Sequence, residues 1–389
     1  MTIAAFIAIS IAIIISGLMA VYLGKRWQFW FNFSLTSYYQ IVYWTVVIMA
    51  GLSIVLSRLS ENISTYWLPL ILNNVCAIMI CSVFMSLIFD IGRWISKKRL
   101  KPQLATKVVY ILGVFSLFYY GHEMAIEPSV VNYQVKINKR AKVNKLRIVQ
   151  LSDIHINDMT SSDRIQDMVD KVNQLNADFI VITGDTLDRR LQPFTEKGFN
   201  KQFQQFKSKY GTYIIFGNHE YLNIKEENNH EQDIINAFKQ ADMKVLKDGV
   251  VYLDNVGVTF IGRDDFSSSH YDIKRASLSD LIMFSNTDEP IILLDHQPHD
   301  LNEPANLGVD LMISGHTHAG QVFPINLIEK LIYKNNYGIY KNTKQHFTSI
   351  VSSGFGFWGP PIRLMTRSEI VVIDVTFDEK TTEFFNFSM

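Results

Sequence analysis

Cysteine is nearly absent from this chain. The two cysteines, Cys76 and Cys81, lie in one apolar run, so the rest of the sequence offers no thiolate to a metal ion and no disulfide. The net charge at pH 7 is zero, whereas nucleic-acid-binding proteins usually carry a basic face. These shortages argue against a disulfide-stapled protein, a cysteine-ligated metal site and a nucleic-acid partner.

Charge is also scarce near the N-terminus. Residues 1–92 contain only five charged side chains: Lys25, Arg26, Arg58, Glu61 and Asp90. Apolar stretches at about 2–23, 38–58, 67–92 and 105–121 approach the roughly 20 apolar residues that a membrane-spanning helix needs. We therefore expect residues 1–125 to form a membrane region with about four transmembrane helices, followed by a separate domain at residues 126–389.

Basic residues between the expected spans predict an orientation. Lys25 and Arg26 follow the first stretch, and a basic run from Arg93 to Lys107 separates the third from the fourth. These two loops should be cytoplasmic, which places residues 126–389 on the extracytoplasmic side of the cell membrane. Because residues 1–22 contain no Lys or Arg, the first stretch is interpreted as an uncleaved span rather than a signal peptide.

The second region changes its pattern along the chain. Strands are expected at 130–139, 146–151, 179–182 and 213–216, with helices at 163–175, 199–206 and 234–240. Further strands are expected at 250–253, 258–261, 291–294, 311–313, 347–351 and 370–375. Strand–helix alternation followed by mostly strands predicts an α/β domain, a two-sheet β-sandwich flanked by helices.

Polar clusters follow several of the expected strands. They are Asp153-Ile154-His155, Gly184-Asp185, Gly217-Asn218-His219-Glu220, His296 and Gly315-His316-Thr317-His318. Together they supply seven candidate metal ligands, which are Asp153, His155, Asp185, Asn218, His296, His316 and His318. Each cluster alone is weak evidence, but the whole set in this order predicts a metal centre.

A pair of cations about 3.5–4 Å apart can deprotonate water, orient it for in-line attack and neutralise phosphate oxygens. One ligand must bridge the two ions, and Asp185 is the candidate because a carboxylate has two anionic oxygens. His219 is better placed to donate a proton to the leaving oxygen than to bind the same ion as Asn218. Oxygen and nitrogen ligands suit Mn, Fe or Zn without choosing among them.

Two pairs of ligands share one spacing. Asp153 and His155 are two residues apart, and so are His316 and His318. On an extended backbone, side chains with this spacing point the same way. We therefore expect each pair to face one site.

The order Asp-x-His, Gly-Asp-x-x-Asp, Gly-Asn-His-Glu, His, Gly-His-x-His resembles the calcineurin-like metallophosphoesterase superfamily over about residues 145–375. Residues 294–298, 314–321, 353–356 and 361–363 resemble its membrane-anchored branch. That branch includes Gram-positive exported phosphoesterases, UDP-2,3-diacylglucosamine pyrophosphatase-type enzymes and a vertebrate transmembrane protein.

The resemblance implies a hydrolase with a dinuclear metal centre and metal-bound hydroxide. It assigns one metal to Asp153, His155, Asp185 and His318, and the other to Asp185, Asn218, His296 and His316. It also assigns catalytic roles to His219, as the acid, and to Asp185. Asp188, the second acid of the Gly-Asp-x-x-Asp element, is expected to support its loop by hydrogen bonding.

The substrate is less constrained. Arg263 and Arg189 are candidates for a phosphate or carboxylate contact. The apolar segment 355–361 fits either a buried core or a groove for an acyl or prenyl chain. The membrane region favours a lipid-linked phosphoester or pyrophosphate as substrate and membrane lipids as partners. The sequence gives no basis for predicting a protein partner. The alternatives are a broad phosphodiesterase or phosphatase acting on soluble substrates, and a non-catalytic membrane receptor that retains the metal site.

Overall fold

The computed structural model describes residues 3–34, 36–60, 66–227 and 230–377. The chain divides into two compact units. The first comprises Met1–Ile126 together with Trp358–Arg363, and the second comprises Glu127–Phe357 together with Leu364–Met389. The chain therefore passes between the units at three points in the sequence, rather than only once near residue 125.

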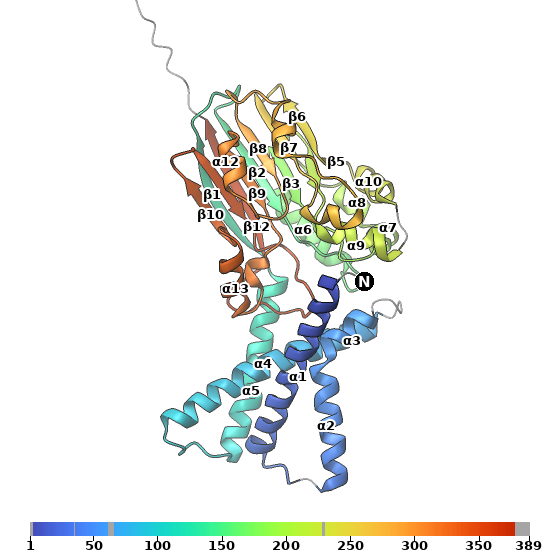
Figure 1. Ribbon diagram of the computed structural model, residues 1–389, viewed down its shortest axis with the longest axis vertical. Helices are drawn as coiled ribbons and strands as arrows, with labels where there is room; N and C mark the ends of the chain where they lie inside the picture. Colours follow the sequence, from blue (N-terminus) through green and yellow to red (C-terminus); the bar gives the residue numbers. More distant parts are fainter. Residues whose placement is uncertain (1–2, 35, 61–65, 228–229, 378–389) are drawn as a thin grey trace, which may run out of the picture. The chain divides into compact units, whose positions relative to one another are not determined.

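The first unit consists of apolar helices (Figure 1). They are α1 (Ile3–Phe31), α2 (Ser37–Gly51), α3 (Ser53–Ser60), α4 (Trp67–Ile95) and α5 (Leu104–Ile126). Segments of three helices, Ser10–Phe31, Trp67–Ile95 and Leu104–Ile126, are long and apolar enough to cross a membrane. The second expected span is broken, because α2 and α3 meet at a bend of 60° and make a fourth crossing only if they count as one span.

Segment 358–363 packs among these helices. The backbone N–H of Arg363 donates to the Gly121 carbonyl of α5 at 2.8 Å. The guanidinium of Arg58, from α3, lies 4.4 Å from the centre of the Trp358 ring. The apolar segment noted in the sequence is thus divided, because Phe355 is buried in the core of the second unit, whereas Trp358 and the residues up to Arg363 belong to the membrane unit.

The second unit contains two six-stranded sheets. The first has the order β1-β12-β2-β3-β4-β5 and the second the order β10-β11-β9-β8-β7-β6. The strands of the first sheet are β1 (Ser129–Ile137), β2 (Lys145–Leu151), β3 (Phe179–Thr183), β4 (Thr212–Ile215), β5 (Met243–Val245) and β12 (Glu369–Phe377). Those of the second are β6 (Gly249–Leu253), β7 (Val258–Gly262), β8 (Ile291–Leu294), β9 (Leu311–Ser314), β10 (Gly338–Asn342) and β11 (Phe347–Val351).

The central strands of each sheet run parallel, from β2 to β5 in the first and from β11 to β7 in the second. Their carboxyl ends therefore meet at one edge of each sheet. Apolar side chains of both sheets pack against one another between them, and the ring centres of Phe179 and Phe260 lie 5.1 Å apart. This burial explains why the central strands are apolar on both faces.

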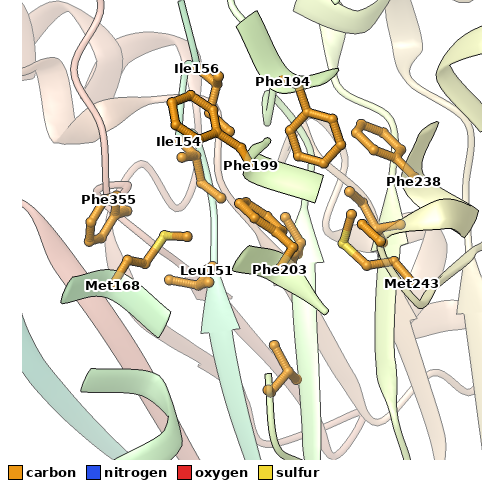
Figure 2. Packing of buried hydrophobic residues seen from close by; sticks show 14 of the residues in the cluster. Leu151, Ile154, Ile156, Met168, Phe194, Phe199, Phe203, Phe238, Met243 and Phe355 are labelled. Carbon is orange, nitrogen blue, oxygen red and sulfur yellow. The ribbon is translucent and has the colours of Figure 1, made fainter. Parts of the chain in front are cut away.

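Helices cover the outer face of each sheet. Against the first sheet lie α6 (Ser162–Gln174), α7 (Gln192–Glu196), α8 (Phe199–Phe203) and α10 (Glu231–Gln240), whose Met168, Phe194, Phe203 and Phe238 share a core with the strands (Figure 2). Against the second lie α11 (Leu278–Ile282) and α12 (Asn302–Asn306). The predicted two-sheet α/β fold is confirmed.

Candidate metal centre

The predicted ligands gather where strands of both sheets end. Asp153 and Asp185 each lie two residues beyond their strands, β2 and β3, and His316 lies two residues beyond β9. The buried Gln150 side chain ties these ends together, because its amide donates to Thr183 Oγ1 at 2.9 Å and to the Ser314 carbonyl at 2.7 Å. The two sheets are therefore linked next to the ligands.

The structure brings the predicted histidines and carboxylates into three overlapping groups. Within each group one ligand atom per residue lies within 4.8 Å of the others. The groups are Asp153 with His155 and His318; His155 with Asp185 and His219; and Asp185 with His296 and His316. Asp185 shares the second group with His155, which also belongs to the first, and shares the third with His296 and His316. Its carboxylate therefore lies beside candidate ligands of both expected ions.

Short distances join ligand atoms within the first and third groups. Nε2 of His155 lies 3.0 Å from Nε2 of His318, and the latter atom lies 3.5 Å from Asp153 Oδ1. Nε2 of His296 lies 3.2 Å from Asp185 Oδ2. Imidazole nitrogens and carboxylate oxygens that point towards one another at these distances can share one cation.

Two buried acceptor atoms support this fit. The Nδ1 of His296 is 2.7 Å from the Thr183 carbonyl, so when the ring is neutral Nδ1 carries the proton and Nε2 keeps a lone pair for a cation. That Nε2 and the Asn218 Oδ1 are buried, and neither has a hydrogen-bond partner among the residues that the structure describes. Buried acceptors without partners are costly, and a metal ion would satisfy both.

The backbone at the ligands is unusual. Asp153, His155, Asp185, His316 and His318 all have positive φ, between 50° and 74°. This left-handed region is uncommon outside glycine and costs about 1–3 kcal/mol for each residue. The expectation that each Asp-x-His or His-x-His pair lies on an extended backbone is therefore wrong. Turns rather than strand alternation aim the side chains, and His316 and His318 fall into different groups.

Gly184 allows the close approach of two ligand loops. Its φ is +88°, and a Cβ there would lie 2.6 Å from His296 Nδ1 and 2.8 Å from the Gly217 nitrogen. Contacts this short do not occur with real Cβ atoms. Only glycine fits between these loops.

His219 is held from one side. Its Nδ1 lies 2.7 Å from the Asp188 carbonyl and 3.0 Å from Asp188 Oδ1. These contacts keep the proton on Nδ1 of the neutral ring and leave Nε2 available for chemistry. Asp188 contacts the His219 ring, in agreement with a supporting role, and it lies in none of the three groups.

Glu220 is a functional residue that the sequence analysis left without a role. It is fully buried at the start of α9 (Asn218–Glu227) and accepts hydrogen bonds from the backbone of Asp185 (3.0 Å), Leu187 (3.0 Å) and Gly217 (2.7 Å). It thus clamps two ligand loops together. Its position directly after His219 in the Gly-Asn-His-Glu cluster could have indicated this role.

Charges inside the site shift the pKa values of its members. Burial works to raise the pKa of Asp185, but His296 and His219 outweigh it and hold that pKa well below the ordinary value. Burial dominates at Asp153, whose pKa rises to about 6. Of the two carboxylates, Asp185 is therefore the one that stays ionised most readily.

The candidate substrate residues differ in their surroundings. Arg263 is buried, with its guanidinium 3.1 Å from Glu303 and 3.5 Å from Asp295, so as a substrate contact it would have to exchange one of these carboxylates for the substrate anion. Arg189 is half-buried and follows Asp188 in the loop that holds His219, which keeps it as a candidate.

Comparison with known proteins identifies the family of the chain. Residues 146–320 match the family model described as calcineurin-like phosphoesterase. An uncharacterised metallophosphoesterase from Campylobacter jejuni is 30% identical over 385 residues, which cover 94% of this chain and 97% of that protein.

Two further relatives are also described as metallophosphoesterases. A metallophosphoesterase from Helicobacter pylori strain 26695 is 31% identical, covering 71% of each chain. A transmembrane protein with metallophosphoesterase domain from Danio rerio is 28% identical, covering 79% of this chain and 74% of that protein. Together with the apolar helices, this relative indicates membrane association. The chain belongs to the calcineurin-like metallophosphoesterase family and is a hydrolase of that family.

Proposed function

We propose that this hydrolase uses two divalent metal ions, Mn, Fe or Zn, to cleave a phosphoester. Asp153, His155 and His318 would hold one ion, Asn218, His296 and His316 would hold the other, and Asp185 would bridge them. The observation that supports this proposal is that Asp185 shares one group of candidate ligands with His155 and another with His296 and His316. Acceptor atoms of His296 and Asn218 also lack hydrogen-bond partners among the described residues.

The protein's own groups have distinct tasks in this proposal. When bound, the two cations supply an acidified water and neutralise charge on the phosphoryl oxygens. Asp185 Oδ1 accepts the backbone N–H of His219 at 2.9 Å, which fixes the carboxylate and the histidine relative to each other. His219, with Nδ1 held by Asp188, would deliver a proton from Nε2 to the leaving oxygen.

The proposed substrate is a membrane lipid-linked phosphoester or pyrophosphate. The support is the apolar helical unit, since an enzyme confined to a membrane meets lipid substrates by two-dimensional diffusion. Arg189 would contact a second anionic group of that substrate. In this proposal α2 and α3 together make one crossing, so that both basic loops are cytoplasmic and the metal centre lies on the extracytoplasmic side of the cell membrane.

The test is hydrolysis by the purified full-length protein with added Mn²⁺. The panel contains chromogenic mono- and diesters, a nucleotide diphosphate sugar and lipid pyrophosphates in detergent, with Asp185→Asn as the control. Preference for a lipid member, abolished by Asp185→Asn, supports the proposal. Equal or faster turnover of the water-soluble esters would replace the lipid-linked substrate with a soluble one. Absence of turnover on the whole panel with two metals bound would favour a non-catalytic membrane role.

A further inference from the structure

The helix α13 (Ile325–Ile332) has its apolar side turned outward. Its exposed apolar residues are Ile325, Leu327, Ile328, Leu331 and Ile332. With about 100° of rotation per residue, these five positions share one continuous face. Leu331 is 88% exposed. Helices of soluble proteins normally bury their apolar face and expose their polar face. In α13 the apolar face is the exposed one.

The opposite side of α13 is polar and faces inward. Atoms Oδ1 of Asn326 and Oε2 of Glu329 are buried and have no hydrogen-bond partner among the described residues. Burial, reinforced by the negative charge of Asp153, raises the pKa of Glu329 to about 8. The polar side of α13 therefore lies close to the metal centre.

The position of α13 on the second unit is fixed by η3 (His318–Gly320), the turn that carries one predicted ligand. Gly320 has a φ of +78°, and a Cβ there would collide with the backbone of Asn326. Because the helix starts this close to the turn, α13 cannot rotate its apolar face inward without moving the His318 turn.

Chain continuity connects α13 with the membrane unit. Residues 321–323, which lead into the helix, pair with Leu364: the Leu364 N–H donates to the Gln321 carbonyl at 3.0 Å, and the Phe323 N–H donates to the Leu364 carbonyl at 3.2 Å. Leu364 directly follows Arg363, the last residue of the segment that packs among the membrane helices. The bridge between Val322 and Leu364 therefore begins one peptide bond after the last residue of the membrane unit.

We propose that α13 lies in the interface of the lipid bilayer and contacts acyl chains with its apolar face. An amphipathic helix in the membrane plane buries such a face at the boundary between headgroups and acyl chains, and basic residues at its edge meet the phosphates. Lys330 is exposed and flanks the apolar face. A bilayer is the favoured occupant over a soluble protein or a second copy, because Leu364 directly follows Arg363, whose backbone N–H donates to the Gly121 carbonyl of the apolar helix α5.

The inference goes beyond the proposed function, since it holds for any substrate of the metal centre. It has one structural consequence. The turn that carries His318 and packs on α13 would be anchored at the headgroup level, so that this side of the metal centre would face lipid phosphates rather than bulk water.

The test places spin labels on the full-length protein in lipid bilayer discs of phosphatidylethanolamine and phosphatidylglycerol. Labels are attached at Leu331→Cys or Ile328→Cys, with Cys76 and Cys81 replaced by alanine. Met283→Cys is the matched control, because Met283 is 80% exposed and lies after α11. Collision with oxygen, which concentrates in lipid, is compared with collision with a water-soluble nickel complex.

The proposal predicts an oxygen-to-nickel collision ratio several-fold higher at positions 331 and 328 than at 283. Equal ratios at all three positions would overturn it, because α13 would then lie in water. Exclusion of both reagents at 331 and 328 would also overturn it, because a protein surface would then cover the helix. The measurement needs no substrate and no metal, so its failure is distinct from a failure of the proposed hydrolysis.

Discussion

His219 is the residue at which proton transfer can be separated from metal binding. We expect His219→Asn to lower kcat about 10²–10⁴-fold on esters with poor leaving groups, the range typical of a lost general acid. The loss should be smaller on a chromogenic ester whose leaving group needs no proton. Steady-state kinetics on both esters, with metal content measured in parallel, checks this.

Metal content should stay at the wild-type level in His219→Asn, because His219 is proposed as the acid and not as a ligand. Asp188→Asn is the matched control for positioning. It keeps the carbonyl contact to Nδ1 and should reduce kcat less than His219→Asn does. If kcat and the metal content of His219→Asn fell together, the result would show that His219 is a metal ligand.

The same histidine predicts how the stability of the metal-free protein depends on pH. Burial opposes protonation, but Asp185 and Asp188 outweigh it and raise the pKa of His219 to about 9. A histidine with a raised pKa contributes stability that is complete below about 6.5 and is lost as the pH rises towards 9. Thermal unfolding of chelator-treated protein should therefore give a falling Tm across this window.

Other groups act in the same direction, since burial also raises the pKa of Glu220 to about 7. The variant His219→Gln isolates the contribution of His219, and its Tm should fall less steeply between pH 6.5 and 9 than that of the wild type. Parallel curves for the two proteins would show that His219 does not carry the effect.

At the scale of elements, the loops after the strands determine the site. Gly184→Ala adds a Cβ both to a left-handed backbone and to a space filled by His296 and Gly217. Gly198→Ala is the matched control, because Gly198 has a φ of +74° and no atom within 4 Å of its would-be Cβ. The control should lose about 1–2 kcal/mol of unfolding free energy, the cost of the left-handed conformation alone.

Gly184→Ala should lose clearly more stability than this control and should also bind metal more weakly. Denaturant unfolding and metal titration of both variants provide the comparison. Similar losses in the two variants would mean that the loops have room to move apart.

The clamp formed by Glu220 is a second device at this scale. In Glu220→Gln one acceptor oxygen becomes an amide donor, so at least one of the three backbone N–H groups loses its partner. We expect a loss of about 1–3 kcal/mol of unfolding free energy, the cost of an unsatisfied buried group. Glu196→Gln, on an exposed position of α7, should change stability little. A neutral Glu220→Gln would show that the ligand loops do not depend on the clamp.

Sequence patterns predicted the apolar central strands because burial on both faces leaves a continuous signal, as in β3 and β8. They missed β5, which has only three residues, and the edge strand β10, in which only Gly338 is fully buried. They also missed α13, because its apolar residues are read as core although they are exposed. The left-handed turns at Asp153 and His316 leave no signal in hydrophobic periodicity. The sequence therefore predicted an extended backbone at these residues, where the structure has turns.

At the scale of the whole molecule, the family resemblance accounts for the second unit and its hydrolase chemistry, while the apolar helices account for membrane association. The division at residue 125 missed the return of the chain at Trp358–Arg363. Composition could not predict that segment 358–363 joins the membrane unit, because an apolar segment fits the core of the second unit equally well.

The most direct test of the central claim is the metal stoichiometry of the purified full-length protein, measured by elemental analysis beside phosphoester turnover. The account predicts about two divalent ions per chain. In Asp185→Asn it predicts fewer bound ions and loss of turnover, because the carboxylate proposed to bridge the two ions is gone. One ion per chain in the active wild type, or an Asp185→Asn variant that keeps both ions and full turnover, would contradict it.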